Sequence, residues 1–114
     1  MVITTTAEVP GYRAARTFGL VRGNTIRGRH AGVDFLAWLR NLVGGEVHEY
    51  TKLMAEAREQ AIDRMVEEAR ALGANAVICV RFETMELMRG ASEILCYGTA
   101  VVLEPEVPGG KEPR

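Results

Sequence analysis

The sequence has no long hydrophobic run, few cysteines, few aromatic residues and no large excess of charge of either sign. Its apolar stretches are far shorter than the ~20 residues of a membrane-spanning helix. The first residues contain neither the basic region nor the apolar region of a secretory signal. Two cysteines are too few for a disulfide framework, so both are expected to be reduced thiols. Together these absences predict a cytoplasmic protein that does not enter a membrane.

Length and composition favour one folded domain. A chain of 114 residues is close to the commonest domain size, and a hydrophobic content of 47% is enough for a core. The charged fraction of 25% and the net charge of -1 argue against intrinsic disorder. We therefore predict a single α+β domain over residues 1–104. Residues 105–114, in which Pro and Gly recur, are predicted to form a flexible C-terminal tail.

Charge is unevenly distributed along the chain. Residues 1–45 contain six arginines and two acidic residues, whereas the remainder contains eight basic and thirteen acidic residues. One hypothesis is a half that binds anions or nucleic acid, and the other is that complementary halves meet, within one chain or between copies. The near-neutral total and the few aromatic residues favour the second hypothesis, so nucleic acid is not the expected partner.

Hydrophobic periodicity predicts strands at both ends of the chain and helices between them. This order indicates an α+β fold with a mainly antiparallel sheet, packed by one long and one short helix. The predicted elements, in chain order, are strands over 2–5 and 16–25, helices over 34–43 and 49–72, and strands over 75–87 and 93–104. The long helix has the clearest signal, with an acidic stripe opposite an apolar face. That apolar face comprises Tyr50, Leu53, Met54, Ala57, Ala61, Met65, Ala69 and Leu72.

The second predicted strand carries two glycines in an alternating pattern. Alternation places Phe18 and Leu20 on one side of the strand and Val21 on the other. Gly19 and Gly23 permit either a bulge or the close approach of another backbone. The small residues along the long helix indicate that this helix lies close against the sheet.

The candidate metal ligands are Cys79, Cys96 and His48, because thiolates and imidazoles bind transition and heavy metals. Their spacing matches no chelating motif of the Cys-x-x-Cys or His-x-x-x-His kind. A hairpin that turns at Gly90 would place Cys79 opposite roughly residue 101 and Cys96 opposite roughly residue 84, too far apart to bind one ion together. Two alternatives stay open: ordinary buried thiols, or ligands that are shared between subunits.

No arrangement of residues indicates catalysis. The acidic stripe of the long helix is typical of a solvated face interleaved with arginine, and Ser92 has no neighbouring His. The better candidate for a small ligand is the basic loop of Arg27, Arg29 and His30, which precedes a predicted helix start and could bind an anion. A solvated basic loop is the alternative. The chain is therefore not expected to be an enzyme.

Several short motifs resemble the YbjQ-like family of small bacterial and archaeal proteins, over nearly the whole chain from residue 2 to residue 104. The combination of Gly-Ala-Asn-Ala-Val after a long helix with Tyr-Gly-Thr-Ala-Val on the last strand carries most of the resemblance. The family is described as a heavy-metal-binding domain, and its members form ring-shaped homopentamers. The resemblance therefore implies an α+β fold, a bound metal ion and a homopentamer. The matching motifs begin at Leu42, Glu49, Glu56, Arg64, Leu72 and Tyr97.

Apolar residues on both faces of the last two strands also indicate a partner. Val77 and Met85 alternate with Ile78 and Phe82, and two helices cover one face of a sheet only. The simplest partner is another copy of the chain. The leading hypothesis is thus a non-enzymatic, heavy-metal-binding homo-oligomer. The alternative is a structural or small-anion-binding ring whose site is the loop Arg27–His30.

Overall fold

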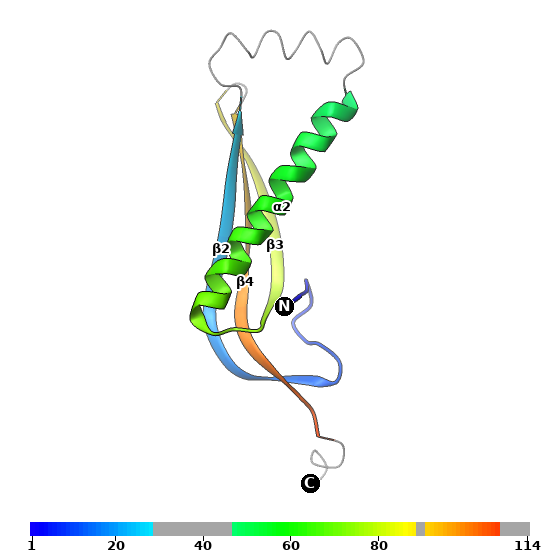
Figure 1. The fold of residues 1–114 in the computed structure, drawn as a ribbon, viewed down its shortest axis with the longest axis vertical. Helices are drawn as coiled ribbons and strands as arrows, with labels where there is room; N and C mark the ends of the chain where they lie inside the picture. The colour runs from blue at the N-terminus through cyan, green and yellow to red at the C-terminus, as the bar shows by residue number, and fades with distance from the viewer. Residues whose placement is uncertain (29–46, 89–90, 108–114) are drawn as a thin grey trace.

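The computed structural model describes residues 1–28, 47–88 and 91–107, apart from the side chains of residues 27–28 and 47–51. The described chain is an α+β fold in which one helix lies across one face of a sheet (Figure 1). The sheet has four strands in the order β1-β3-β4-β2. The two long pairings, β2–β4 and β3–β4, are antiparallel as predicted. The short β1–β3 pair is parallel, so the sheet as a whole is mixed. The elements are β1 (Val2–Ile3), β2 (Tyr12–Gly28), α2 (Val47–Leu72), β3 (Ala76–Met88) and β4 (Ala91–Pro105).

Two sequence predictions fall outside the described residues. The short helix expected over 34–43 is one of them, and most of the C-terminal tail expected over 105–114 is the other. No helix in the described ranges is long and apolar enough to cross a membrane. The chain is elongated: its Cα radius of gyration is 19.1 Å, whereas a compact domain of this length has a radius of about 13 Å.

Strand β2 is longer than predicted and pairs with β4 along its whole length, from Tyr12 opposite Pro105 to Gly28 opposite Ala91. The predicted alternation is confirmed for Val21, which is buried, and for Leu20, which is 63% exposed. It is wrong for Phe18, which packs against the core beneath α2. A bulge between Thr17 and Gly19, where Gly19 has a φ of +111°, shifts the alternation at that point.

Helix α2 buries a narrow stripe of small residues around one methionine. Ala57, Ala61, Met65 and Ala69 are fully buried, as the periodicity predicts, but Leu72 at the helix end is 46% exposed. A Cβ atom at Gly23 would collide with the backbone of α2, at the carbonyl oxygen of Ala61 and the amide of Met65. The predicted close approach of another backbone at this glycine is therefore confirmed.

The end of α2 is fixed by a Schellman motif. Gly73, with a φ of +96°, donates its N–H to the carbonyl of Arg70, and Ala74 donates to the carbonyl of Ala69. Asn75 then joins the last strand, because its side chain donates to the carbonyl of Leu103 at 3.0 Å and accepts from the N–H of Leu103 at 2.8 Å. The chain thus passes from helix to sheet in three residues.

Two side chains of α2 also protect the free edge of β2. The N–H of Arg22 donates to Glu68 Oε1 at 2.7 Å, and Arg64 Nη1 donates to the carbonyl of Asn24 at 2.7 Å. These groups point away from β4, so no strand in the described part of the chain pairs with them. Charged side chains in this role block strand pairing at these two backbone groups.

Candidate functional site

Of the predicted metal ligands, Cys96 lies deepest in the core. It projects from β4 toward α2, has no exposed surface, and its Sγ lies 3.6 Å from the thioether sulfur of Met65. Burial raises the pKa of the Cys96 thiol to about 11. A neutral thiol in an apolar core is a poor ligand, because metals bind the thiolate. Cys96 therefore acts as a core residue.

Cys79 occupies a different environment, in a bulge of β3 between Ile78 and Arg81. It is half-buried, has a φ of +58°, and donates its N–H to the carbonyl of Thr6 at 3.0 Å. The predicted hairpin register is wrong, because Met88 pairs with Ala91 and the bulge adds a further shift. Cys96 lies opposite Phe82, not residue 84, and Cys79 lies near residue 98 of β4. The two cysteine Cα atoms are therefore separated by roughly 10 Å, and both thiols are free.

The remaining predicted ligands cannot be placed. His48 belongs to the first turn of α2, but its side chain lies outside the described part, as do His30, Arg29 and the side chain of Arg27. In the ranges that the structure describes, no three His, Cys, Asp or Glu side chains come together to hold a metal ion. With Cys96 neutral and buried, the described residues do not fit a heavy metal within one chain.

The raised pKa of Cys96 predicts a loss of stability in alkaline solution. In the folded chain the thiol keeps its proton up to about pH 11, whereas in the unfolded chain it ionises near its ordinary pKa of 9.0. The contribution of the protonated thiol to the free energy of unfolding is complete below pH 9 and is lost as the pH rises toward 11. We expect wild type to lose about 2 kcal/mol more than Cys96→Ala between pH 8 and pH 10.5, measured by urea unfolding under reducing conditions. Equal losses in the two proteins would contradict a desolvated Cys96.

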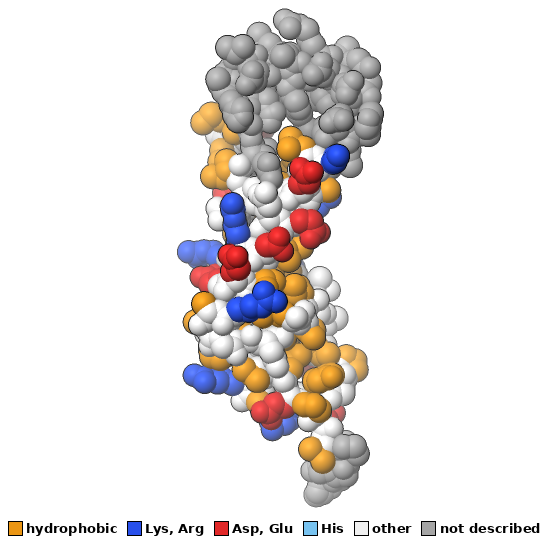
Figure 2. Space-filling view, viewed as in Figure 1, with side chains coloured by type: hydrophobic (Ala, Val, Ile, Leu, Met, Phe, Trp, Pro, Cys, Tyr) orange, Lys and Arg blue, Asp and Glu red, His pale blue; other side chains and the backbone are white. Residues whose placement is uncertain are grey.

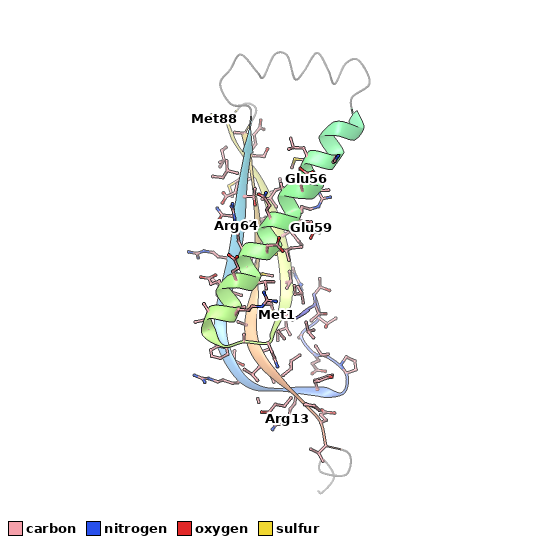
Figure 3. All side chains as sticks on the ribbon, in the orientation of Figure 1. Met1, Arg13, Glu56, Glu59, Arg64 and Met88 are labelled. Carbon is pink, nitrogen blue, oxygen red and sulfur yellow. The ribbon has the colours of Figure 1, made fainter. Side chains whose placement is uncertain are left out.

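The acidic stripe of α2 offers no catalytic arrangement among the described residues. Glu56 and Glu59 are exposed on the helix surface, and acidic and basic side chains lie interspersed over α2 (Figures 2 and 3). The one ion pair found in the described ranges is remote, between Arg13 on β2 and Glu104 on β4, at 2.9 Å. Both of its side chains are exposed, so it adds little to stability.

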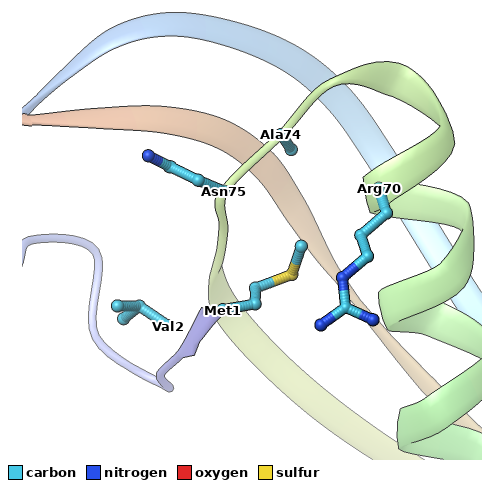
Figure 4. Close-up of a pocket in the computed structure, with 5 residues that line it drawn as sticks. All are labelled: Met1, Val2, Arg70, Ala74 and Asn75. Carbon is cyan, nitrogen blue, oxygen red and sulfur yellow. The ribbon is translucent and has the colours of Figure 1, made fainter.

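A shallow hollow of about 460 Å³ lies where α2 ends beside β1. Arg70 from the helix and Met1 from the N-terminal segment extend into it, as Figure 4 shows. Asn75 also lines it, but both polar atoms of its side chain are bonded to Leu103. Among its lining side chains, the guanidinium of Arg70 is the one charged group, and none is a carboxylate, imidazole or thiol.

The two most specific sequence motifs turn out to have structural roles, which sequence reasoning did not identify. Gly73, Ala74 and Asn75 connect α2 to the sheet as described above. In the last strand, a Cβ atom at Gly98 would lie 2.7 Å from Val77 Cγ1 and 2.9 Å from the carbonyl oxygen of Ile78, at the bulge of β3. A glycine is needed to admit the bulge. The first motif thus joins α2 to the sheet, and the second admits the bulge of β3 beside β4.

Comparison with known proteins agrees with this fold and identifies the family. A UPF0145 protein of Thermus thermophilus is 57% identical over 105 residues, covering 92% of each chain. One from Dehalococcoides mccartyi is 54% identical over 104 residues, 91% of this chain and the whole of the relative. A crystal structure of a protein of unknown function from Pediococcus pentosaceus, of the DUF74 family, superposes with a TM-score of 0.64 over 91% of this chain and 98% of the other, at 16% identity. The profile of the YbjQ family, described as "Putative heavy-metal-binding", matches residues 1–104, so the chain belongs to the YbjQ family.

Proposed function

We propose that this chain is a non-enzymatic binding protein of the cytoplasm that works as a homo-oligomeric ring. In this proposal, copies of the chain cover surfaces that a single copy leaves open. The observation that carries it is the open face of the sheet, on the side opposite α2. The pentamer implied by the family resemblance is the expected size of the ring.

The open face of the sheet carries large apolar side chains that no described residue covers. By register, Leu20, Ile26 and Met85 all project from this side, since their partners on β4 alternate with the residues that face α2. They are exposed by 63%, 60% and 49%, respectively. Near β1, the same face is covered by Val9, which packs against Ala76, Val101 and Leu103 with Ile78. The part that the described residues leave uncovered is therefore the half of the sheet nearer the β3–β4 turn.

The elongated shape supports the same proposal. A radius of gyration of 19.1 Å means that much of the sheet lies far from the centre of the chain. Association of copies would bury apolar surface at a gain of about 25 cal/mol per Å². Heterologous contacts around a ring would also bring the arginine-rich β2 near the more acidic later part of the chain.

Metal binding enters this proposal only through ligands shared between copies. The described residues of one chain supply a half-buried Cys79 and no second ligand beside it. His48 is the other candidate, from the start of α2. The alternative ligand is a small anion held by Arg27, Arg29 and His30.

Native mass spectrometry tests the proposal directly. We expect wild type to give one discrete oligomer. The double variant Cys79→Ser/Cys96→Ser should give the same oligomer, because neither thiol is proposed to contact another subunit. A wild-type chain that is monomeric over the whole accessible concentration range would contradict the proposal. The spectra are repeated with Zn²⁺, Cu⁺ and Ni²⁺. If each subunit carries one ion that a chelator removes and that the double variant does not bind, a metal site between copies is established. If only scattered, nonspecific adducts appear, metal binding is not part of the function and the homo-oligomer alone remains.

A further inference from the structure

The two edges of the sheet are treated differently by the fold. At the β2 edge, Glu68 and Arg64 of α2 occupy the N–H of Arg22 and the carbonyl of Asn24. At the other edge, β1 pairs only with Ala76 and Val77 of β3, and the N-terminal segment bonds as far as Val80. Beyond that point, residues 81–88 of β3 are all exposed. No described segment pairs with their outer side.

The backbone groups that this edge presents follow from the ladder with β4. In an antiparallel sheet, alternate residues direct both the N–H and the carbonyl to the same neighbour. The N–H of Val80 donates to Thr4, away from β4, so Phe82, Thr84 and Glu86 also direct their backbone groups away from β4. We call residues 82–86 the free β3 edge. It contains no lysine or proline, the residues that commonly prevent strand pairing.

We infer that the free β3 edge pairs with the β2 strand of a neighbouring copy, in the part of β2 near Ile26. This inference rests on the proposed homo-oligomer and names one strand contact between its copies. The pairing would extend the sheet from one copy to the next and would leave the positions capped by Glu68 and Arg64 undisturbed.

The placement of α2 is the first argument for β2 as the partner strand. Helix α2 packs chiefly against β2 and β4 and covers β3 only as far as Val80, so Phe82 is 42% exposed on the helix side. Phe82 lies in one row with Cys96 and Gly23, where α2 presses on β2. A neighbouring β2 would bring its own α2 to the same level and cover Phe82. Pairing of two β3 edges would instead leave both Phe82 side chains uncovered.

Charge is the second argument. In the half of β2 near Ile26, the strand has no acidic residue and carries Arg22 among its described side chains. The free β3 edge carries Glu83 and Glu86, whereas the guanidinium of Arg81 is held by the carbonyls of Thr5 and Val80. A β3–β2 contact between copies therefore joins an acidic strand to a basic one, and a β3–β3 contact joins two acidic strands.

The third argument is height along the sheet. Ile26 on β2 and Met85 on β3 both lie opposite Glu93 of β4, so the two edges present their open groups at the same level. A head-to-tail contact between two surfaces at equal height repeats by rotation without a rise along the axis. Such a contact is compatible with a closed ring, which forms when the rotation from one copy to the next closes.

Two edge variants test the inference. Thr84→Pro and Ile26→Pro each remove one outward-facing N–H for which the described residues provide no acceptor. Each protein alone is expected to be monomeric by sedimentation velocity, with a far-UV circular dichroism spectrum like that of wild type. Because each retains one intact edge, a mixture of the two should give a one-to-one heterodimer. Thr84→Ala and Ile26→Val, which keep the N–H, are the matched controls and should keep the wild-type oligomer.

Each other outcome identifies what fails. If Thr84→Pro is monomeric but Ile26→Pro assembles as wild type does, another surface pairs with β3 and the inference is wrong. If both variants assemble as wild type does, the β2 and β3 edges do not form the contact between copies and the inference is wrong. The proposed homo-oligomer is not contradicted by that result. If wild type is monomeric, the proposed function fails. Should either proline variant not fold, Phe82→Glu provides the readout, since its half-exposed side chain tolerates charge in a monomer; unchanged assembly in that variant contradicts the inference.

Discussion

Gly23→Ala is expected to lower the free energy of unfolding by about 3 kcal/mol or more, at the upper end of the cost of overpacking a core. The added methyl group would meet backbone atoms of α2, the carbonyl oxygen of Ala61 and the amide of Met65, which cannot rotate away. The helix would have to move off the sheet. Urea unfolding measured by circular dichroism gives the difference directly.

Gly98→Ala is the graded comparison for this experiment. Its Cβ atom would mainly meet side-chain methyl groups of Val77 and Val80, together with the carbonyl oxygen of Ile78. Side chains can adjust where a helix backbone cannot, so a loss of about 1–3 kcal/mol is expected. If Gly23→Ala is tolerated better than Gly98→Ala, the tight contact between α2 and β2 does not hold.

Met65→Ala is expected to cost about 2–5 kcal/mol, because it removes a fully buried side chain and leaves a cavity next to Cys96. Leu72→Ala, on the same helix, removes a similar side chain that is 46% exposed, so it should cost about 1 kcal/mol or less. Thermal and urea unfolding of the two variants measure the difference. Equal losses would show that Met65 is not at the centre of the core.

The sequence predicted the type and order of the described elements because their periodicity is long and regular. Apolar residues at every third or fourth position located α2, and apolar residues concentrated in two runs located both strands of the hairpin, each to within about two residues. The small residues Ala57, Ala61 and Ala69, together with Gly23, correctly indicated a close contact between helix and sheet. These features follow from local spacing and residue size.

Features that depend on one backbone conformation could not be predicted in the same way. The predicted hairpin register was off by two residues at Cys96 and by about three at Cys79. Neither the bulge at Cys79 nor the pairing of Met88 with Ala91 leaves a pattern in the sequence. The side of β2 on which Phe18 lies depends on the bulge at Gly19 in the same way. The predicted metal ligands were chosen by chemical type alone. Whether they come together depends on burial and register, which brought none of the described ones into a cluster.

The pairing of β2 with β4 has a consequence for the order in which the chain folds. Strands β3 and β4 are neighbours in sequence, whereas the partners Tyr12 and Pro105 lie at opposite ends of the chain. Contacts between distant residues form slowly, because a long loop must close before they contribute. The β3–β4 hairpin and α2 can therefore form early. Until β2 pairs with it, the edge of β4 that faces away from β3 has no partner strand. In a growing chain β4 is made after β2, α2 and β3, so β2 can dock only once β4 has been synthesised.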